Sequence, residues 1–195
     1  PYSSSKACSE IATSTYRNSF FSKSGIKIAS VRAGNVIGGG DWATDRLIPD
    51  FFRSIENNDL LLVRSPKAVR PWQHVLDPLS GYLMLAEKLV IKGHNFAEAW
   101  NFGPNHNDNK TVKWVLNRFS KQFSNSKWET ETKNQLYEAN LLKLDISKAK
   151  SKLGWIPRWS LETSIDNTIK WYQAYKENKN MIDFSIKQIK AHQSS

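Results

Sequence analysis

The order of helical and β-rich segments near the start of the chain restricts the fold more than any other feature. Residues 3–22 form an apolar face with helical spacing, surrounded by serine and threonine, which predicts a closely packed helix. That face consists of Ala7, Ile11, Ala12 and Thr15. Gly25 ends the helix, and residues 26–32 follow as a short β-rich run. A helix followed by a strand is one step of an α/β alternation, so we predict a layered α/β protein.

The same alternation continues along the rest of the chain. Asp45 is the expected N-cap of the next helix, and Ser160 is the expected cap of the last one. We assign no fold to the polar segment after Asn178. The further predicted helices are residues 45–57, 77–92, 111–123, 147–153 and 161–176, and the further predicted strands are residues 60–64, 99–102 and 127–132.

The charge and the cysteine content narrow the functional classes. A formal net charge of +10 could indicate nucleic-acid binding. The lysines of the second half are scattered as on a solvated helical surface, which is the interpretation we favour, and we expect neither nucleic acid nor membrane as a partner. A basic balance also suits an anionic small substrate drawn into a cleft. The single Cys8 excludes an intramolecular disulfide framework, and no Cys/His spacing indicates a zinc site. The apolar runs are shorter than the roughly 20 residues of a bilayer span, so we expect a soluble, cytoplasmic protein.

Tyr2 and Lys6 are the first candidate chemical groups. They stand four residues apart, which on a helix places both on one face, one turn apart. An ammonium beside a phenol favours the phenolate, so the tyrosine could exchange protons near neutral pH. The spacing alone indicates little, because it recurs at residues 172–176 and 175–179 on a later helix.

Four later segments give the pair its context. Residues 32–38 read RAGNVIG, residues 45–49 read DRLIP, residues 70–77 read RPWQHVLD, and residues 153–157 read LGWIP. In this order and spacing, the segments resemble the extended short-chain dehydrogenase/reductase family of NAD-dependent epimerases and dehydratases. The resemblance runs from Tyr2 to about Trp171, which is nearly the whole chain.

This resemblance implies the C-terminal part of an NAD(P)-binding Rossmann-fold protein joined to a smaller α/β substrate-binding domain. We therefore expect the N-terminal Rossmann half to be missing, because the family's glycine-rich phosphate loop and its elimination acid and base would lie before Tyr2. The expected division is residues 1–40 as a remnant of the dinucleotide-binding domain, residues 41–178 as mainly the nucleotide-sugar part, and residues 179–195 as a polar tail. Such a fragment is expected to be inactive and poorly stable alone.

Within the family, the wording RAGNVIGGGDW, DRLIPD and RPWQHVLDPL is most similar to CDP-glucose 4,6-dehydratases. This branch implies NAD-dependent conversion of CDP-glucose to CDP-4-keto-6-deoxyglucose, a hydro-lyase reaction, by an enzyme that forms a dimer or tetramer at full length. The alternatives are a nucleotide-sugar epimerase, a dehydratase for GDP-, dTDP- or UDP-sugars, and a non-catalytic nucleotide-sugar-binding module. Residues 137–139 read YEA where related dehydratases more often read HEA.

The resemblance also implies a role for the residues that match the motifs. Tyr2 would take the proton of the sugar 4-hydroxyl, Lys6 would hold the nicotinamide ribose, and the backbone around Ala33 would pass near the nicotinamide amide of NAD. The residues that would bind the substrate are Asn35, Arg46, Arg70 and Asn101. Among them the two arginines would meet the diphosphate, because a guanidinium suits paired oxygens.

Several of these residues also have a structural interpretation. Trp72 is more typical of a core than of a ligand site, and His74 is more typical of a structural hydrogen bond than of catalysis. Asn35 could cap the glycine-rich turn, and Arg70 could be a surface arginine. The glycines at residues 38–40 lack the spacing of a dinucleotide loop.

Overall fold

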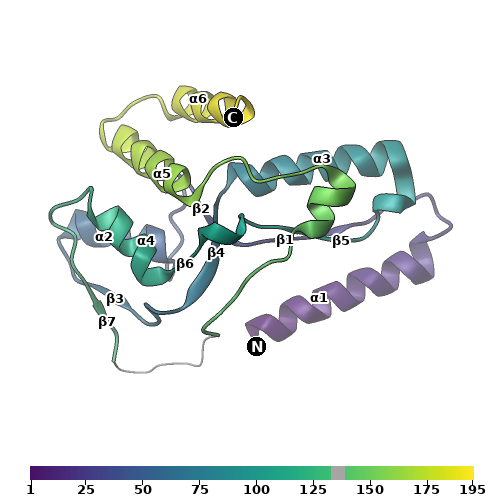
Figure 1. Ribbon diagram of the computed structural model, residues 1–195, viewed down its shortest axis with the longest axis horizontal. Helices are drawn as coiled ribbons and strands as arrows, with labels where there is room; N and C mark the ends of the chain where they lie inside the picture. The colour runs from purple at the N-terminus through teal and green to yellow at the C-terminus, as the bar shows by residue number, and fades with distance from the viewer. Residues whose placement is uncertain (133–138) are drawn as a thin grey trace.

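The computed structural model describes residues 1–132 and 139–195 and confirms the α/β class (Figure 1). The strands are β1 (Ser30–Ala33), β2 (Asn35–Ile37), β3 (Leu61–Val63), β4 (Val69–His74), β5 (Ala99–Phe102), β6 (Asn109–Thr111) and β7 (Trp128–Thr130). The α-helices are α1 (Tyr2–Tyr16), α2 (Leu47–Asn57), α3 (Leu76–Lys92), α4 (Val112–Ser120), α5 (Leu161–Lys176) and α6 (Met181–Gln193). Short π-helical and 3-10 turns are η1 (Arg17–Phe21), η2 (Gly93–Phe96), η3 (His106–Asp108) and η4 (Ala149–Leu153).

Parallel strand pairs form the centre of the fold. β1 pairs with β5, β2 with β4, and β3 with β7, all in parallel, while β6 joins β4 in the antiparallel sense. Ser30 lies opposite Ala99 in the first pair, and Asn35 lies opposite Trp72 in the second. Parallel strands require helical crossovers, which explains why helices separate most of the strands along the chain.

Gly34 lies where the chain leaves β1 and enters β2. A Cβ atom at this position would stand 2.2 Å from the carbonyl oxygen of Pro71 in β4. The backbones therefore approach each other closely at this point, and only glycine fits without a shift. This approach lets the chain pass from its pairing with β5 to its pairing with β4.

One core cluster lies among α2, α4, α5 and the strands β2 to β4. Phe51, Phe52 and Phe119 are buried in it, with ring centroids 5.5 to 5.9 Å apart. Trp72 is buried in the same cluster, and its Nε1 donates a hydrogen bond of 3.0 Å to the carbonyl of Lys110. The prediction that Trp72 belongs to the core is confirmed.

A second core cluster packs α3 and β5 against the LGWIP segment. Gly154 takes a left-handed conformation with φ +72° and ends η4, so that Trp155 turns into the core. The Trp155 ring meets Phe102 edge-on at 5.0 Å, and its Nε1 donates a hydrogen bond of 3.0 Å to Oγ of Ser80. This segment of the family motif is therefore part of the structural core.

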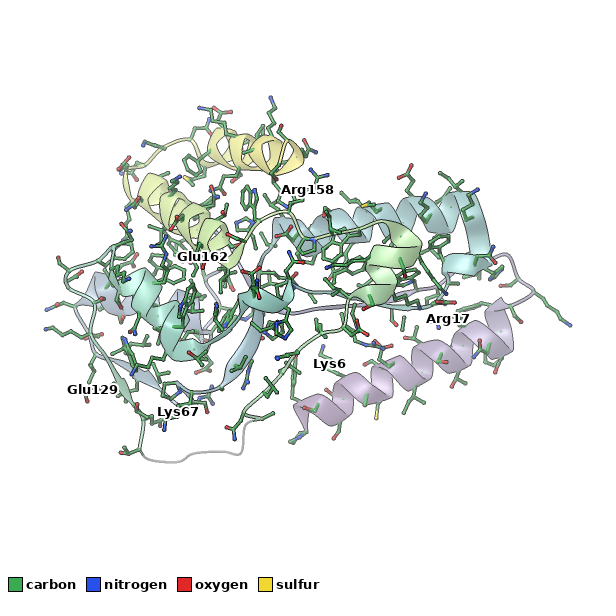
Figure 2. All side chains as sticks on the ribbon, viewed as in Figure 1. Lys6, Arg17, Lys67, Glu129, Arg158 and Glu162 are labelled. Atoms are coloured by element: carbon green, nitrogen blue, oxygen red, sulfur yellow. The ribbon has the colours of Figure 1, made fainter. Side chains whose placement is uncertain are left out.

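α1 differs from the closely packed helix predicted for it, because each of its residues is at least partly exposed. Its links to β1 are polar. Glu10 forms an ion pair of 2.8 Å with Arg32 and accepts a hydrogen bond of 2.7 Å from Ser30. Just beyond the helix, Arg17 donates a hydrogen bond of 3.0 Å from Nε to the carbonyl of Ile28 (Figure 2). The apolar spacing alone is misleading, since one ion pair and two hydrogen bonds link this part of the chain to its neighbours.

Two local predictions need correction, and β4 is a strand that the sequence does not predict. The strand predicted over residues 26–32 begins only at Ser30. The sequence does not predict β4 for two reasons. Residues 70–74 are all buried, so apolar and polar side chains do not alternate along the strand, and the segment contains a proline. Asp45 is not the N-cap of α2: it has φ +59°, and Arg46 takes the N-cap position.

The segment after Asn178, to which the sequence alone assigns no fold, contains helix α6. Asn180 caps α6 by accepting hydrogen bonds from the backbone N–H groups of Ile182 and Asp183 at 3.1 and 3.3 Å. Near the other end, Nε2 of His192 lies 3.0 Å from the buried Asp77 carboxylate. Arg158, which lies between α6 and α3 in Figure 2, donates a hydrogen bond of 3.0 Å to the carbonyl of His192. Polar contacts therefore anchor a helix whose sequence lacks a strong apolar face.

The lengths and polarities of the helices bear on whether one of them could span a membrane. Over residues 1–132 and 139–195, every helix is too short or too polar to cross a bilayer.

Candidate active site

A cleft of about 820 Å³ opens beside β2, β3, the beginning of β4 and the N-terminus of α2. Five of the seven predicted site residues line this cleft. They are Tyr2, Ala33, Asn35, Arg46 and Arg70. The fold therefore brings together residues from four separate motifs that lie up to 68 positions apart (2 to 70) in the sequence.

Tyr2 and Lys6 lie at the start of α1, one helical turn apart. The Lys6 ammonium is 5.4 Å from the centroid of the Tyr2 ring, and Figure 2 shows Lys6 on the side of α1 that faces the strands. Tyr2 is 75% exposed, so its phenol is accessible to a bound molecule. Lys6 lies outside the residues that line the cleft, next to Tyr2 on the same helix. A phenol beside an ammonium is an arrangement suited to proton exchange.

Ala33 and Asn35 flank the Gly34 crossing between β1 and β2. Both are half-buried and both line the cleft. Because Asn35 belongs to β2, opposite Trp72, its position is set by the sheet and not by a turn. Its amide offers both donor and acceptor groups to a ligand.

Arg46 lies at the N-terminus of α2, and Asp41 of the preceding loop forms an ion pair with it. Its guanidinium lies 3.1 Å from the carboxylate of Asp41, and its side chain is 66% exposed. Asp41 also accepts a hydrogen bond of 3.1 Å from the backbone N–H of Ala43. A cation at a helix N-terminus adds to the positive end of the helix dipole, and together they favour an anionic ligand.

Arg70 provides a second guanidinium in the cleft. It is only 6% exposed and donates a hydrogen bond of 3.0 Å to the carbonyl of Val69. It is therefore a buried arginine of β4, and its interpretation as a surface residue is wrong. A third arginine, Arg64, follows β3 and lines the same cleft. Three arginines around one cavity fit a ligand with several phosphate oxygens.

Asn101 lies in β5, outside the cleft. Its Oδ1 accepts a hydrogen bond of 3.0 Å from Arg32, and its Nδ2 donates one of 3.1 Å to the carbonyl of Asp145. In this conformation the amide joins three segments of the chain. The predicted contact with the nucleotide would require these hydrogen bonds to be exchanged.

His74 is buried at the end of β4. Its Nδ1 accepts a hydrogen bond of 3.3 Å from the backbone N–H of Leu76, and its ring meets Trp159 at 4.8 Å. Burial lowers the pKa of His74 to about 4, so the ring is neutral at physiological pH. These contacts agree with a structural role for His74.

Asp41, Arg64 and Ser65 line the cleft but were missed by sequence reasoning. Arg64 ended a predicted strand, which placed it at a sheet edge but gave no direction for its side chain. Asp41 follows the three glycines, whose spacing indicates no binding role. Tyr137, where the sequence reads YEA and related dehydratases more often read HEA, lies outside the described residues.

Comparison with known proteins identifies the family. The family model described as GDP-mannose 4,6 dehydratase matches residues 1–168. The chain belongs to this family. It is 46% identical, over its full length, to CDP-glucose 4,6-dehydratase of Salmonella typhimurium, which confirms the resemblance to that branch. It is 28% identical to dTDP-glucose 4,6-dehydratase of Escherichia coli over 91% of its length.

Solved structures show the same fold. The TM-score is 0.72 with TunA, an NAD-dependent NDP-hexosamine 5,6-dehydratase, at 18% identity, covering 94% of this chain and 55% of that one. It is 0.70 with dTDP-glucose 4,6-dehydratase of Bacillus anthracis in complex with NAD, at 22% identity, covering 91% and 53%. The chain spans 56% and 49% of the lengths of the Salmonella and Escherichia enzymes.

Proposed function

We propose that this chain belongs to an NAD-dependent 4,6-dehydratase that converts CDP-glucose to CDP-4-keto-6-deoxyglucose. The observation that carries the proposal is the single cleft in which Tyr2, Asn35, Arg46 and Arg70 meet. The 46% identity to the Salmonella CDP-glucose enzyme supports CDP-glucose as the substrate. The three arginines that line the cleft can donate charge-assisted hydrogen bonds to the diphosphate of a nucleotide sugar.

The residues present fit a nicotinamide cofactor on one side of the cleft. The exposed Tyr2 phenol, the Lys6 ammonium one turn away and the backbone at Ala33 offer polar groups to a nicotinamide and its ribose. Bound NAD⁺ supplies a hydride acceptor for oxidation at C4 and a hydride donor for the later reduction at C6. We assign Lys6 to the ribose and Ala33 to the amide.

Tyr2 acts as the base of the first step. Its phenolate takes the proton of the 4-hydroxyl while the C4–H bond breaks, and the Lys6 ammonium stabilises the phenolate. The 4-keto-6-deoxy product further requires that the C5 proton and the 6-hydroxyl leave as water and that C5 regains a proton, and NAD held at Tyr2, Lys6 and Ala33 would supply to C6 the hydride taken from C4. The net change is the loss of one water molecule. We assign no described residue to the elimination step.

The remaining site residues hold the substrate. Arg46 and Arg70 bind the diphosphate through charge-assisted hydrogen bonds, and Asn35 binds the sugar or its phosphate. Asn101 would contact the nucleotide only after releasing Arg32 and Asp145. Residues 1–40 would contribute to the dinucleotide-binding domain and residues 41–178 mainly to the nucleotide-sugar part, interleaved with it.

The test uses the full-length protein, incubated with NAD⁺ and CDP-glucose. We expect a CDP-4-keto-6-deoxy sugar, identified by mass spectrometry as the loss of water and by NMR from the new methyl group. A CDP sugar of unchanged mass with inverted C4 would show an epimerase. Binding of CDP without any conversion would show a non-catalytic module. Parallel reactions with GDP-, dTDP- and UDP-glucose test the choice of nucleotide, and light scattering tests the proposed dimer or tetramer.

A further inference from the structure

The segment between β2 and α2 delivers Arg46 to the cleft. We call residues 38–46 the cleft loop; four of its members, Gly38, Asp41, Asp45 and Arg46, line the cleft. Arg46 is a long and mostly exposed side chain, and its guanidinium lies 3.1 Å from Asp41. Ordering such a side chain on a ligand costs conformational entropy. The affinity for a diphosphate therefore depends on how firmly the cleft loop holds Asp41 and Arg46 beforehand.

Tyr172 of α5 fixes the cleft loop from outside the cleft. Its hydroxyl donates a hydrogen bond of 2.8 Å to the carbonyl of Asp41. Tyr172 is only 2% exposed, and its ring stacks on Phe52 at a centroid distance of 3.5 Å. Burial raises the pKa of Tyr172 to about 12, so the hydroxyl keeps its proton and remains a donor at physiological pH. Tyr172 itself lies outside the residues that line the cleft.

Arg53 of α2 holds the next two carbonyls of the cleft loop. It donates hydrogen bonds of 3.1 and 3.0 Å to the carbonyls of Trp42 and Ala43, and it is ion-paired with Asp50. Three consecutive carbonyls, those of residues 41 to 43, are thus each bound by a side chain that belongs to a helix. The backbone next to the Asp41 carboxylate therefore has few conformations open to it.

Aromatic packing holds the same loop against α5. The Trp42 ring contacts Tyr172 and Tyr175 at centroid distances of 5.3 and 5.0 Å. A Cβ atom on Gly39 would lie 2.0 Å from the Trp171 ring, so this close approach needs glycine. Trp171 donates a hydrogen bond of 3.0 Å from Nε1 to Ser185 of α6. Contacts thus run from α6 through α5 to the cleft loop.

We propose that Tyr172 is a positioning residue of the nucleotide-sugar site. Its hydroxyl fixes the backbone of Asp41, the Asp41 carboxylate sets the guanidinium of Arg46, and Arg46 meets the diphosphate. Helix α5 therefore tunes the affinity for substrate without touching it. This inference rests on the proposed function in one respect, which is that Arg46 binds the diphosphate.

The experiment compares Tyr172→Phe, Arg46→Ala and the double variant in the full-length protein. Calorimetry with CDP gives the dissociation constant, steady-state kinetics with CDP-glucose give KM and kcat, and thermal unfolding checks the fold. We expect Tyr172→Phe to raise the dissociation constant and KM about two- to tenfold, the value of one hydrogen bond, while kcat stays nearly constant. In the Arg46→Ala background the same change should have less than about a twofold effect.

Tyr175→Phe is the matched control, because it removes an exposed hydroxyl and keeps the ring against Trp42. It should leave the affinity for CDP unchanged. If Tyr172→Phe fails to fold, Arg53→Gln loosens the same loop from its other side and should show the same dependence on Arg46.

The outcomes distinguish the binding role of Arg46 from the positioning role of Tyr172. Unchanged affinity for CDP in Arg46→Ala would overturn the diphosphate role of Arg46, and the positioning role of Tyr172 with it. Weaker binding in Arg46→Ala, combined with an equal effect of Tyr172→Phe in both backgrounds, would overturn the positioning role alone. A loss of affinity in Tyr172→Phe that disappears when Arg46 is absent supports it.

Discussion

The tyrosine side and the arginine side of the cleft are held in place by different means. α1 carries Tyr2 and Lys6, all of its residues are at least partly exposed, and Glu10 links it to β1 by polar contacts. β4 carries Arg70 and is buried almost throughout, beside a core of aromatic rings. The group proposed for proton transfer therefore lies on an element that adds little to the core. Arg70, which is proposed to bind the substrate, lies on a strand that forms part of the core.

The strongest test of this contrast is Tyr2→Phe in the full-length protein. We expect turnover of CDP-glucose to fall by about 10²- to 10⁴-fold, since the phenol acts in proton transfer. Binding of the nucleotide sugar and the melting temperature should stay near their original values, because Tyr2 is 75% exposed. Steady-state kinetics, calorimetry and thermal unfolding measure the three quantities. Turnover close to that of the original enzyme would exclude Tyr2 as the base.

A paired substitution compares the stability of the two sides. Phe119→Ala removes a fully buried ring that packs on Phe51 and Phe52, and we expect it to lower the free energy of unfolding by about 3–5 kcal/mol. Ile11→Ala, on the exposed surface of α1, should change it by less than about 0.5 kcal/mol. Denaturant titration of both variants gives the values. Equal losses would show that α1 is as much part of the core as α4.

Arg70→Ala tests the binding role of the buried side. We expect the affinity for CDP-glucose to fall by about 1.5–3 kcal/mol for each charge-assisted hydrogen bond lost, with the affinity for NAD⁺ unchanged. Calorimetry with each ligand measures the difference. Arg70→Lys serves as the control for charge, and it should recover only part of the affinity because it lacks the paired donors. Unchanged affinity in Arg70→Ala would remove Arg70 from the substrate site.

The smallest expected effect is at the link between α1 and β1. The hydrogen bond from Arg32 holds the pKa of Glu10 below its usual value, so the ionised form is favoured in the folded state. Its stabilising contribution is therefore present at neutral pH and is lost as the pH falls through the lowered pKa. Because both side chains are partly exposed, we expect less than about 1 kcal/mol.

Glu10→Gln should remove the same stabilising contribution at neutral pH, because the amide carries no charge. The protection factors of the α1 amides, which compare the observed exchange rate with the intrinsic rate at the same pH, should fall in the original protein on acidification and be low at both pH values in Glu10→Gln. An unchanged exchange rate in the variant would show that the ion pair does not hold the helix.

Much of the site could be predicted because its residues sit in short motifs with a fixed spacing. Tyr2, Asn35, Arg46 and Arg70 were found in this way, and all four line the cleft. Asn101 has no such motif around it, and its strand turns the side chain toward Arg32 and Asp145 instead. Arg64 also has no motif, and only the arrangement of β3 beside the cleft shows that it belongs there.

Helices with a clear apolar period and a capping residue followed from local pattern alone. α5 begins after Ser160, whose side chain accepts a hydrogen bond from the N–H of Thr163, as its sequence indicates. Packing decided the elements that lack such a pattern. β4 is a strand because both of its neighbours pair with it, and α6 is a helix docked by His192 on Asp77 and by Arg158.

The physical reason for this division is the range of the interactions. Helical periodicity, caps and turn glycines act within a few residues, so the order of letters reveals them. The contact of Tyr172 with Asp41 joins residues 131 positions apart, and that of His192 with Asp77 joins residues 115 positions apart. Such pairs form only when the whole chain has folded, and no local pattern marks them in advance. The sequence therefore shows which residues can carry chemistry, while long-range packing determines which of them meet.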